Sequence, residues 1–540
     1  MSIFSHRIKL LPAVVAIGIA FVAGIGTQAL TPSPYDRAKR WTAQGAALVE
    51  GLLGKQKRVV AANLVPVKQS LDTVLLPLFK ETITLPADAG VAPIAGGITT
   101  YGNDIIIADR LGGFYNVSER GTKITKLALP ALPNHIAEYL KFAWRINVDG
   151  FRVHDVKSRQ EPGGLRLFVS FENFLPDRRA TNLALATILL SNKDLAPIGA
   201  WEMLYESQPL LVDQKNYAGL GGGGAVLVVG NKVYLSVGDY VQDSVSFPSR
   251  MMAQDPNSDF GTIEAIDITT KQKTRISNGH RNPEGLALNW QGLIYETEQG
   301  PNGGDELNLI EPGKNYGWPI ETYGTDYTSY GWPHALVDTR GMKFQKPVFA
   351  WVPDIAPTEI IEADNFNSRW DHDFLVASLQ AETLFRLHME EGRVVYVEPI
   401  FLGERIRDLA ITADGTLVLW TDAAHLIFLN VDKATLLGNR RAHETIADAA
   451  LAPCMTCHHV GPTTPYSLAP SLSKIFGRKI ASDSFDRYSA ALKGVNGEWN
   501  EKNLFLFLTN PSGFAPGTAM TYSTSAADAY EIIDLLKNLD

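Results

Sequence analysis

Two cysteines lie close together near the C-terminus and are followed directly by a histidine. Cys454, Cys457 and His458 form the pattern Cys-x-x-Cys-His, and the chain contains no other cysteine. Two thiols at this spacing can form thioether bonds to the vinyl groups of a haem, and the adjacent imidazole can then ligate the iron. A redox-active dithiol is the alternative, but it needs no adjacent histidine and normally lies in a βαβ pattern, which is missing here. The motif therefore predicts one covalent haem c.

An iron atom held by one imidazole needs a second ligand from a later segment. Met520 lies 62 residues after His458, in the stretch PGTAM at 516–520. A methionine in such a Gly/Pro loop is badly placed to fill a helix core, which favours the ligand role. His459 has a suitable donor atom, but it adjoins His458 and cannot reach the opposite face of a haem. Ligation by His458 and Met520 leaves no open iron position and predicts an electron carrier.

The composition excludes several classes of protein. The 540 residues carry 49 Lys plus Arg against 58 Asp plus Glu, a net charge of −9, and nucleic-acid binders need clustered positive charge. We therefore expect no nucleic-acid partner. Two cysteines rule out both a disulfide scaffold and a four-cysteine zinc site.

The N-terminus contains a long apolar segment. Arg7 and Lys9 precede residues 10–30, which are 21 residues without a charge. This length is about the 20 residues that span a bilayer and exceeds the core of a cleaved signal peptide, although cleavage stays open as the alternative. We expect residues 1–34 to form a single-pass membrane anchor. Either interpretation exports the rest of the chain.

The central part of the chain repeats one loose pattern of a turn followed by alternating or β-branched residues. Six instances occur, at 97–109, 163–170, 225–239, 285–296, 374–377 and 409–419. Six copies at intervals of about 40–75 residues favour a six-bladed β-propeller over 85–432, with a pair of β-sandwiches as the alternative. Before it, we expect a helical connector at 35–84. After it, we expect a polar linker at 433–444 and a small all-α domain at 445–540.

The C-terminal domain resembles a class I cytochrome c. The matching stretches are CMTCH (454–458), APSL (469–472), IFGRK (475–479), YSAALK (488–493), GEW (497–499), LFLFLTN (504–510) and PGTAM (516–520). The resemblance implies that the Pro470 carbonyl accepts the ring N–H of His458, and that Tyr488 and Trp499 hydrogen-bond a haem propionate. Ala469 departs from the pattern, because the family often has Gly there. In this family haem is attached outside the cytoplasm, which implies a body on the periplasmic side of a bacterial inner membrane.

The propeller resembles the soluble quinoprotein glucose/sorbosone (aldose sugar) dehydrogenases, six-bladed propellers that use pyrroloquinoline quinone (PQQ) and calcium. The run that carries the resemblance is GHRNPEGLA (279–287), EQGPNGGDELN (298–308) and GKNYGWP (313–319). It implies a structural calcium site at Asp305, Glu306 and the Tyr316 carbonyl, because hard cations take carboxylate and carbonyl oxygens. A solvated acidic turn is the alternative. The carbonyls of Gly300 and Pro301 match the calcium that bridges to PQQ.

Several of the family's catalytic and quinone-binding residues are replaced in this sequence. Its general-base histidine should lie in the turn at 220–226, which reads LGGGGAV, and no histidine occurs between His154 and His280. Gln242 stands where the family has a quinone-binding arginine, and Gln380 where it has a lysine, whereas Arg405 and Arg407 match its Arg-x-Arg. PQQ carries three carboxylates, so these losses should weaken its binding. Asp239 or Tyr240 could serve as another base, but neither stands out.

Two functions follow from these residues. The first is a membrane-anchored periplasmic cytochrome whose propeller has lost catalysis and serves as a docking body. It would act in a membrane electron-transport complex or with another redox protein. The alternative is a PQQ-dependent sugar or alcohol dehydrogenase that passes electrons through its own haem c. The missing histidine and the two missing cations favour the first.

Overall fold

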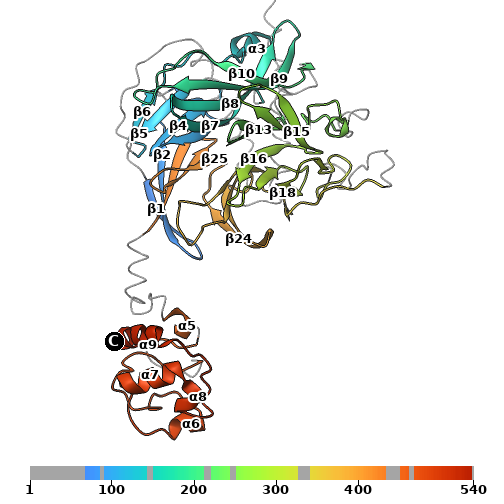
Figure 1. Cartoon of the computed structure of the whole chain (residues 1–540). Coiled ribbons are helices and arrows are strands. Elements are labelled where there is room, and N and C mark those ends of the chain that lie inside the picture. The colour runs from blue at the N-terminus through green and yellow to red at the C-terminus, as the bar shows by residue number, and fades with distance from the viewer. Residues whose placement is uncertain are drawn as a thin grey trace, which may run out of the picture.

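A computed structural model describes residues 67–85, 90–118, 120–142, 150–211, 220–243, 251–325, 341–432, 451–455, 457–460 and 468–537 (Figure 1). The expected anchor at 1–34, the first part of the expected connector and the linker at 433–444 lie outside these residues. Within the described residues, the helices are too short or too polar to cross a bilayer.

The described residues form six sheets, and the first three follow one another along the chain. Blade 1 contains β3 (Gly96–Tyr101), β4 (Asp104–Asp109), β5 (Phe114–Ser118) and β6 (Lys123–Lys126). Blade 2 contains β7 (Val153–Glu161), β8 (Gly164–Leu175), β9 (Ala180–Leu190), β10 (Glu202–Glu206) and the short β11 (Leu210–Leu211). Blade 3 contains β12 (Gly223–Val229), β13 (Lys232–Val237), β14 (Thr262–Asp267), β15 (Lys273–Asn278) and β19 (Lys314–Asn315). Helix α3 (Ile136–Phe142) precedes blade 2, and the 3-10 helix η2 (Met252–Gln254) lies within blade 3.

The other three sheets complete a ring. Blade 4 contains β16 (Pro283–Leu288), β17 (Ile294–Glu298), β18 (Asp305–Ile310) and β20 (Phe349–Trp351). Blade 5 contains β21 (Pro357–Glu362), β22 (Phe374–Ser378), β23 (Thr383–Glu390) and β24 (Arg393–Phe401). Blade 6 contains β25 (Ile406–Ile411), β26 (Leu417–Thr421), β27 (His425–Val431), β2 (Pro77–Thr84) and β1 (Val67–Asp72). The first strands β3, β7, β12, β16, β21 and β25 each contact the next, and β25 contacts β3, which closes the ring.

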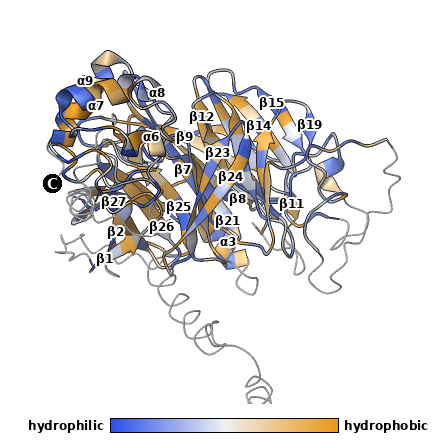
Figure 2. Ribbon diagram, turned by 90° about the horizontal axis from the view of Figure 1, so that it is seen from below, coloured by the Kyte–Doolittle hydropathy of each residue, from blue (hydrophilic) through white to orange (hydrophobic). Residues whose placement is uncertain are grey.

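The six-bladed propeller predicted from the repeats is confirmed, since each of the six repeat instances lies in a different blade. Hydrophobic residues follow the strands in Figure 2, and buried apolar side chains pack between neighbouring blades. One such core joins Ile83 and Trp420 of blade 6 to Ile98 and Ile107 of blade 1. Packing of this kind is the reason a radial array can bury both faces of every blade.

The prediction of a helical connector up to residue 84 is wrong for its last part. Residues 67–84 contain the strands β1 and β2, and β2 pairs with β27 from Leu78 opposite Val431 to Thr84 opposite His425. The backbone groups of β27 would otherwise form an unpaired sheet edge, so the N-terminal strand completes the last blade. The propeller therefore begins at residue 67 rather than at 85.

A single lysine joins three blades near their first strands. The Lys157 ammonium on β7 lies 3.1 Å from Asp155 Oδ1 and 3.9 Å from Asp408 Oδ1 of β25, and it donates to Glu359 of β21. All three carboxylates are buried. Burial by itself lowers the pKa of Lys157, but the carboxylates of Asp155, Asp408 and Glu359 raise it well above its ordinary value. The cluster therefore holds a permanent positive charge among three acids.

The C-terminal residues form a separate set of helices around their own core. They are α5 (Ala452–Met455), α6 (Ala490–Lys493), α7 (Glu501–Thr509), α8 (Pro511–Phe514) and α9 (Ala526–Lys537). The side chains of Ser489 and Asn500 cap α6 and α7 by accepting from backbone N–H groups in the first turn. Helices α7 and α9 pack together, and Leu504 and Ile532 are buried in the core that they share. This core supports the pocket described next.

Candidate functional site

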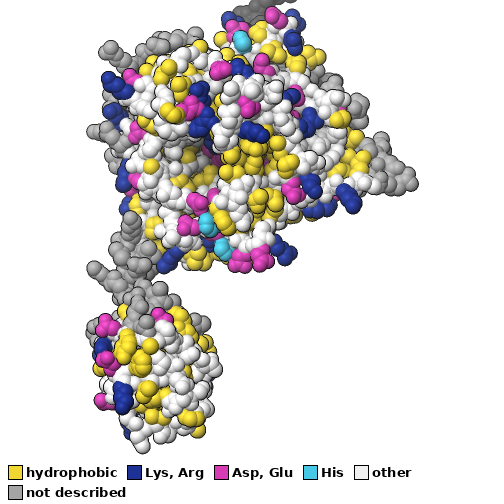
Figure 3. All heavy atoms as spheres, viewed as in Figure 1, with side chains coloured by type: hydrophobic (Ala, Val, Ile, Leu, Met, Phe, Trp, Pro, Cys, Tyr) yellow, Lys and Arg dark blue, Asp and Glu magenta, His cyan; other side chains and the backbone are white. Residues whose placement is uncertain are grey.

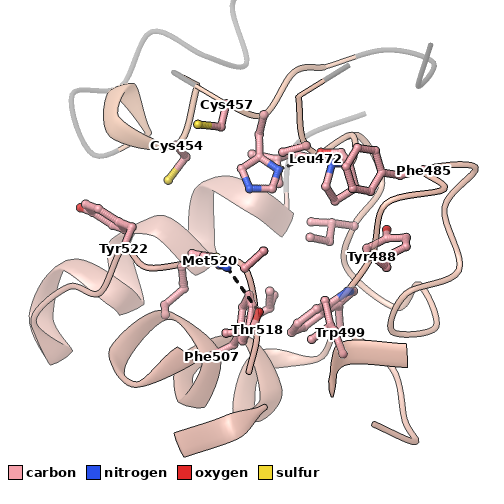
Figure 4. Close-up of a pocket in the computed structure, with 18 of the residues that line it drawn as sticks. Cys454, Cys457, Leu472, Phe485, Tyr488, Trp499, Phe507, Thr518, Met520 and Tyr522 are labelled. Atoms are coloured by element: carbon pink, nitrogen blue, oxygen red, sulfur yellow. Dashed lines mark hydrogen bonds between the residues drawn. The ribbon is translucent and has the colours of Figure 1, made fainter. Parts of the chain in front are cut away.

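The C-terminal helices enclose a cavity of about 370 Å³, within the range of small-molecule and cofactor sites (Figure 4). Its wall brings together every residue that the sequence predicted for a haem site. These are Cys454, Cys457, His458, Pro470, Tyr488, Trp499 and Met520. The rest of the wall is mostly apolar, with Leu472, Phe507 and Ile532 among its members.

The cysteine motif follows a single helical turn. The backbone N–H groups of Cys457 and His458 donate to the Cys454 carbonyl, at 3.2 and 2.9 Å. This turn places both sulfurs on one side of the cavity in Figure 4. Both thiols are free, and burial raises the pKa of Cys454. The two thiols are thus available for bonds to a group inside the cavity.

The orientation of His458 is fixed by one hydrogen bond. Its Nδ1 lies 2.8 Å from the Pro470 carbonyl oxygen. A carbonyl can only accept, so Nδ1 carries the proton and Nε2 keeps a lone pair. Burial lowers the pKa of His458, and the nearby charges of His459 and Arg478 lower it further. A neutral imidazole with a free Nε2 is the form that ligates a metal.

Met520 lies on the other side of the cavity from Cys454 and Cys457 (Figure 4). Its loop turns at Gly517, where φ is +91°, and the N–H of Thr518 donates to the Ala515 carbonyl at 2.9 Å. The Met520 N–H donates to Thr518 Oγ1 at 3.4 Å. The loop therefore presents a thioether to a cavity that one imidazole and two thiols also line, and this donor set fits a haem c.

Arg478 was missed by the sequence analysis. It lines the cavity, and its guanidinium donates to the Ser471 carbonyl at 2.6 Å and to the Ser473 carbonyl at 3.2 Å. Its buried Nε has no hydrogen-bond partner among the described residues. A half-buried guanidinium with an unsatisfied Nε, beside Tyr488 and Trp499, suits a carboxylate of the bound group. The stretch IFGRK contained the signal, a basic residue among apolar ones.

In the propeller, the glycine-rich turn that lacks the family's histidine is closed by other side chains. A Cβ atom at Gly222 would lie 3.1 Å from Cε1 of His154 and 3.2 Å from both Glu172 Oε1 and Tyr240 Oη. At Gly224, where φ is +104°, it would lie 2.5 Å from the Cβ of His154. The His154 side chain of β7 therefore packs against the glycines of this turn. A histidine side chain at Gly222 or Gly224 would collide with His154.

His154, Glu172 and Tyr240 form a buried network behind that turn. Glu172 Oε1 lies 3.2 Å from His154 Nε2 and accepts from the Tyr240 hydroxyl at 2.6 Å. The side chains of His154 and Glu172 are 2% and 0% exposed. Burial raises the pKa of Glu172 to about 8 and holds that of His154 well below its ordinary value. A base sealed in this way cannot reach a substrate hydroxyl.

Asp239, the other candidate base, is also held in hydrogen bonds to neighbouring groups. Its carboxylate accepts from the Trp318 indole at 2.6 Å and from the Val241 N–H at 2.7 Å. Burial raises the pKa of Asp239 to about 7. Its two oxygens therefore hold the turn and the indole in place.

The pKa of Glu172 predicts a dependence of stability on pH. Its carboxyl ionises near pH 8 in the folded chain and near 4.5 when exposed, so the free energy of unfolding falls as pH rises between these values. In Glu172→Gln we expect this fall to be smaller by about 2–4 kcal/mol, at about 1.4 kcal/mol per pKa unit with allowance for relaxation. Urea unfolding at pH 5 and pH 8 measures it. Glu391→Gln changes an exposed residue and is the control: its free energy of unfolding should decrease between pH 5 and pH 8 as much as that of the wild type. An equally large decrease in Glu172→Gln would contradict the expectation.

Of the four residues matched to a quinone pocket, only the two arginines lie together. Arg405 and Arg407 lie together, and both pair with Asp422, with Nε–Oδ distances of 3.0 Å. Gln242 is buried, and its amide donates to the Tyr240 carbonyl at 3.2 Å. Gln380 is exposed beyond the end of β22. One carboxylate and two guanidiniums leave a small net positive charge for a tricarboxylate, so the residues present fit PQQ poorly.

The structure does not bring Asp305 and Glu306 to one site. They are neighbours on β18, where successive side chains point to opposite faces. Asp305 accepts from the N–H groups of Gly300, Ile355 and Ala356 at 2.7–2.8 Å and so organises the backbone. The Gly300 carbonyl accepts from Arg281 at 2.6 Å. Asp305 therefore has a role in the local backbone, and the calcium site that joins it to Glu306 stays a prediction.

Glu306 lies instead in a buried cluster that sequence spacing did not reveal. Its carboxylate contacts Glu298, and His280 Nδ1 lies 3.4 Å from Glu298 Oε2 and 4.0 Å from Glu296 Oε2. The Tyr316 ring stacks on His280 at 4.5 Å. His280 Nδ1 and Glu296 Oε1 have no hydrogen-bond partner among the described residues. Burial raises the pKa of Glu298 to about 7, and one cation would satisfy the cluster.

The propeller and the C-terminal helices each have similar known proteins. Residues 164–429 match the family model "Glucose / Sorbosone dehydrogenase". The aldose sugar dehydrogenase YliI of Escherichia coli is 33% identical over 155 residues, which are 27% of this chain and 40% of that protein. A solved glucose dehydrogenase is 25% identical with a TM-score of 0.50, covering 63% of this chain and 98% of its own.

The C-terminal segment has relatives of its own. A cytochrome c homolog from Rickettsia typhi is 39% identical over 87 residues, which are 16% of this chain and 50% of that protein. The chain thus spans half or less of the length of these curated relatives. Residues 164–429 are therefore similar to the glucose/sorbosone dehydrogenase family, and the C-terminal segment of the chain is similar to cytochrome c homologs.

Proposed function

We propose that this chain is a membrane-anchored, periplasmic c-type cytochrome that transfers electrons, with its propeller serving as a docking body in a membrane electron-transport assembly. One observation carries the proposal. Cys454, Cys457, His458 and Met520 line a single cavity, and His458 is held in the tautomer that leaves Nε2 free.

Eight of the residues that line the cavity would hold a haem. Cys454 and Cys457 would form the thioether bonds to a haem, and His458 Nε2 and the Met520 sulfur would ligate its iron. Pro470 holds the His458 ring, while Arg478, Tyr488 and Trp499 would bind the carboxylates of the haem. The bound haem supplies reversible one-electron transfer. The apolar wall excludes water and favours the less charged, reduced state, which gives a comparatively high potential.

The membrane anchor at residues 10–30 and the periplasmic location belong to the same proposal. The length of the apolar segment supports the anchor, and covalent haem supports export. On the face in Figure 3, Lys and Arg side chains are scattered among acidic ones, which argues against a nucleic-acid partner. A calcium ion in the cluster of Glu306, Glu296 and Glu298 would stabilise blade 4 without taking part in electron transfer.

The docking role rests on the closed turn of the propeller. His154 fills the space beside Gly222 and Gly224, and its own imidazole is buried against Glu172. Asp239 and Tyr240 are both buried, so neither side chain is accessible to a substrate hydroxyl. Without a base, hydroxyl oxidation would lose about 10²–10⁴ in rate.

The alternative is a PQQ-dependent sugar or alcohol dehydrogenase that reduces its own haem. The family match of residues 164–429 favours it, as does the retained pair of Arg405 and Arg407. The two functions differ in where the electrons enter the chain, so they can be separated by experiment.

The separating experiment adds PQQ and Ca²⁺ to the purified haem-loaded chain, and then aldoses, while haem absorption is followed. We expect no haem reduction within minutes and no PQQ binding at micromolar cofactor, because the base and two cations are missing. Reduction by ascorbate provides the positive control. Rapid haem reduction by a sugar in the wild type, together with its loss in Arg405→Ala/Arg407→Ala, would overturn the docking role and establish the dehydrogenase.

A further inference from the structure

Three side chains with metal-ligating atoms meet in the turn between β21 and β22 of blade 5. Glu362 ends β21, Asp364 follows two residues later, and His372 lies in the loop before β22. His372 Nδ1 is 3.7 Å from Glu362 Oε1 and 3.5 Å from Asp364 Oδ1. This group lies in a different blade from the His280 cluster and outside the cavity of the C-terminal helices.

Glu362 supplies a buried oxygen atom without a partner. Its side chain is only 8% exposed, and Oε1 has no hydrogen-bond partner among the described residues. Oε1 points at the imidazole of His372 and the carboxylate of Asp364. Buried carboxylate oxygens are almost always satisfied, so this one indicates a ligand at the centre of the group.

An ion pair alone does not account for the spacing. A protonated imidazole that donates to a carboxylate lies about 2.7–2.9 Å from its oxygen. Separations of 3.5 and 3.7 Å are too long for such bonds. Two ligand atoms on one zinc-like ion, each about 2.1 Å from it in a tetrahedral arrangement, lie about 3.4 Å apart. The observed distances agree with the second arrangement.

The loop holds these side chains in place and leaves the group open to water. The His372 N–H donates to Asp364 Oδ1 at 3.2 Å, which ties the two ligands together. The His372 ring packs against Trp290 of the neighbouring blade, with ring centroids 4.9 Å apart. His372 and Asp364 are 54% and 49% exposed, so water can complete the coordination.

We propose that Glu362, Asp364 and His372 form a binding site for one first-row divalent cation of the zinc class. The donor set decides the class, because imidazole nitrogen favours such ions over calcium and magnesium, while two carboxylates neutralise the charge. The remaining position is open, which makes the site accessible from solution. Trp290 lies in the loop between β16 and β17, so a bound ion would also tie blade 5 to blade 4 through the His372 ring.

The test uses the full haem-loaded chain, in which the cysteine thiols are occupied. After removal of metal with a chelator, the protein is titrated with Zn²⁺ by calorimetry. We expect Glu362→Gln/His372→Ala to bind one equivalent less than the wild type, and Asp364→Asn to bind at that site at least tenfold more weakly. His388→Ala is the matched control, since His388 is also a partly exposed histidine that contacts two carboxylates, and this variant should bind zinc as the wild type does.

Circular dichroism establishes that each variant is folded before it is compared. In crystals soaked with Zn²⁺, an anomalous peak about 2.0–2.2 Å from His372 Nδ1 would support the site directly. An unchanged stoichiometry in the double variant would overturn the proposal. So would an anomalous signal confined to the His280 cluster.

Discussion

Replacing Met520 by leucine is expected to abolish the absorption of six-coordinate low-spin haem and to lower the reduction potential. Leucine keeps the volume of the side chain, so the swap removes the sulfur ligand with little change in packing. Met520 is the thioether that faces the cavity across from Cys454 and Cys457. Loss of this ligand should lower the potential on the order of 0.1 V, within the range of ~0.8 V that axial ligands span.

Met455→Leu is the matched control for this change. Met455 lies in the same domain, between the two cysteines in sequence, and packs against the core without lining the cavity. We expect its spectrum and potential to equal those of the wild type. Optical spectra and potentiometric titration of the three proteins provide the measurement. An unchanged spectrum in Met520→Leu would refute the assignment of this ligand.

Replacing Lys157 by methionine is expected to lower the free energy of unfolding by about 3–5 kcal/mol, which is typical when one partner of a buried ion pair is removed. The ammonium lies among Asp155, Glu359 and Asp408, which come from three blades. Without it, the carboxylates would repel one another or bind protons. Urea unfolding, followed by circular dichroism of the sheet, measures the loss at pH 7.

Lys273→Met provides the comparison for the lysine variant. Lys273 pairs with Asp259, but its side chain is 47% exposed, and such surface pairs contribute only about 0–1 kcal/mol. The loss in Lys157→Met should also be smaller at pH 5, where protons can replace the missing charge. If Lys157→Met were as stable as the wild type at pH 7, the Lys157 cluster would not stabilise the contacts between the blades.

The parts of the fold that depend on local sequence were predictable. Each repeat instance marks a turn and its strands, so six of them gave six blades. The strands at 67–84 were not predictable in this way, because β2 forms by pairing with β27, about 350 residues later. Residues 77–84 show no clear two-residue alternation, and only the partner strand makes them extended.

The same distinction holds for the candidate sites. The cysteine motif and the loop at Met520 are short and self-contained, and their residues line one cavity. His154 could not be foreseen, since it reaches the glycine-rich turn from a neighbouring blade. Asp305 and Glu306 were grouped through the family resemblance, whereas their alternation along β18 points the two side chains to opposite faces.

The central claim is that the C-terminal helices hold one covalent haem c, and a pyridine haemochrome spectrum of the purified chain tests it most directly. We predict the spectrum of a c-type haem at one per chain, retained after extraction with acidified acetone, and absent from Cys454→Ala/Cys457→Ala. A chain produced with active haem attachment that shows no haem, or a haem that is extracted completely, would contradict the account.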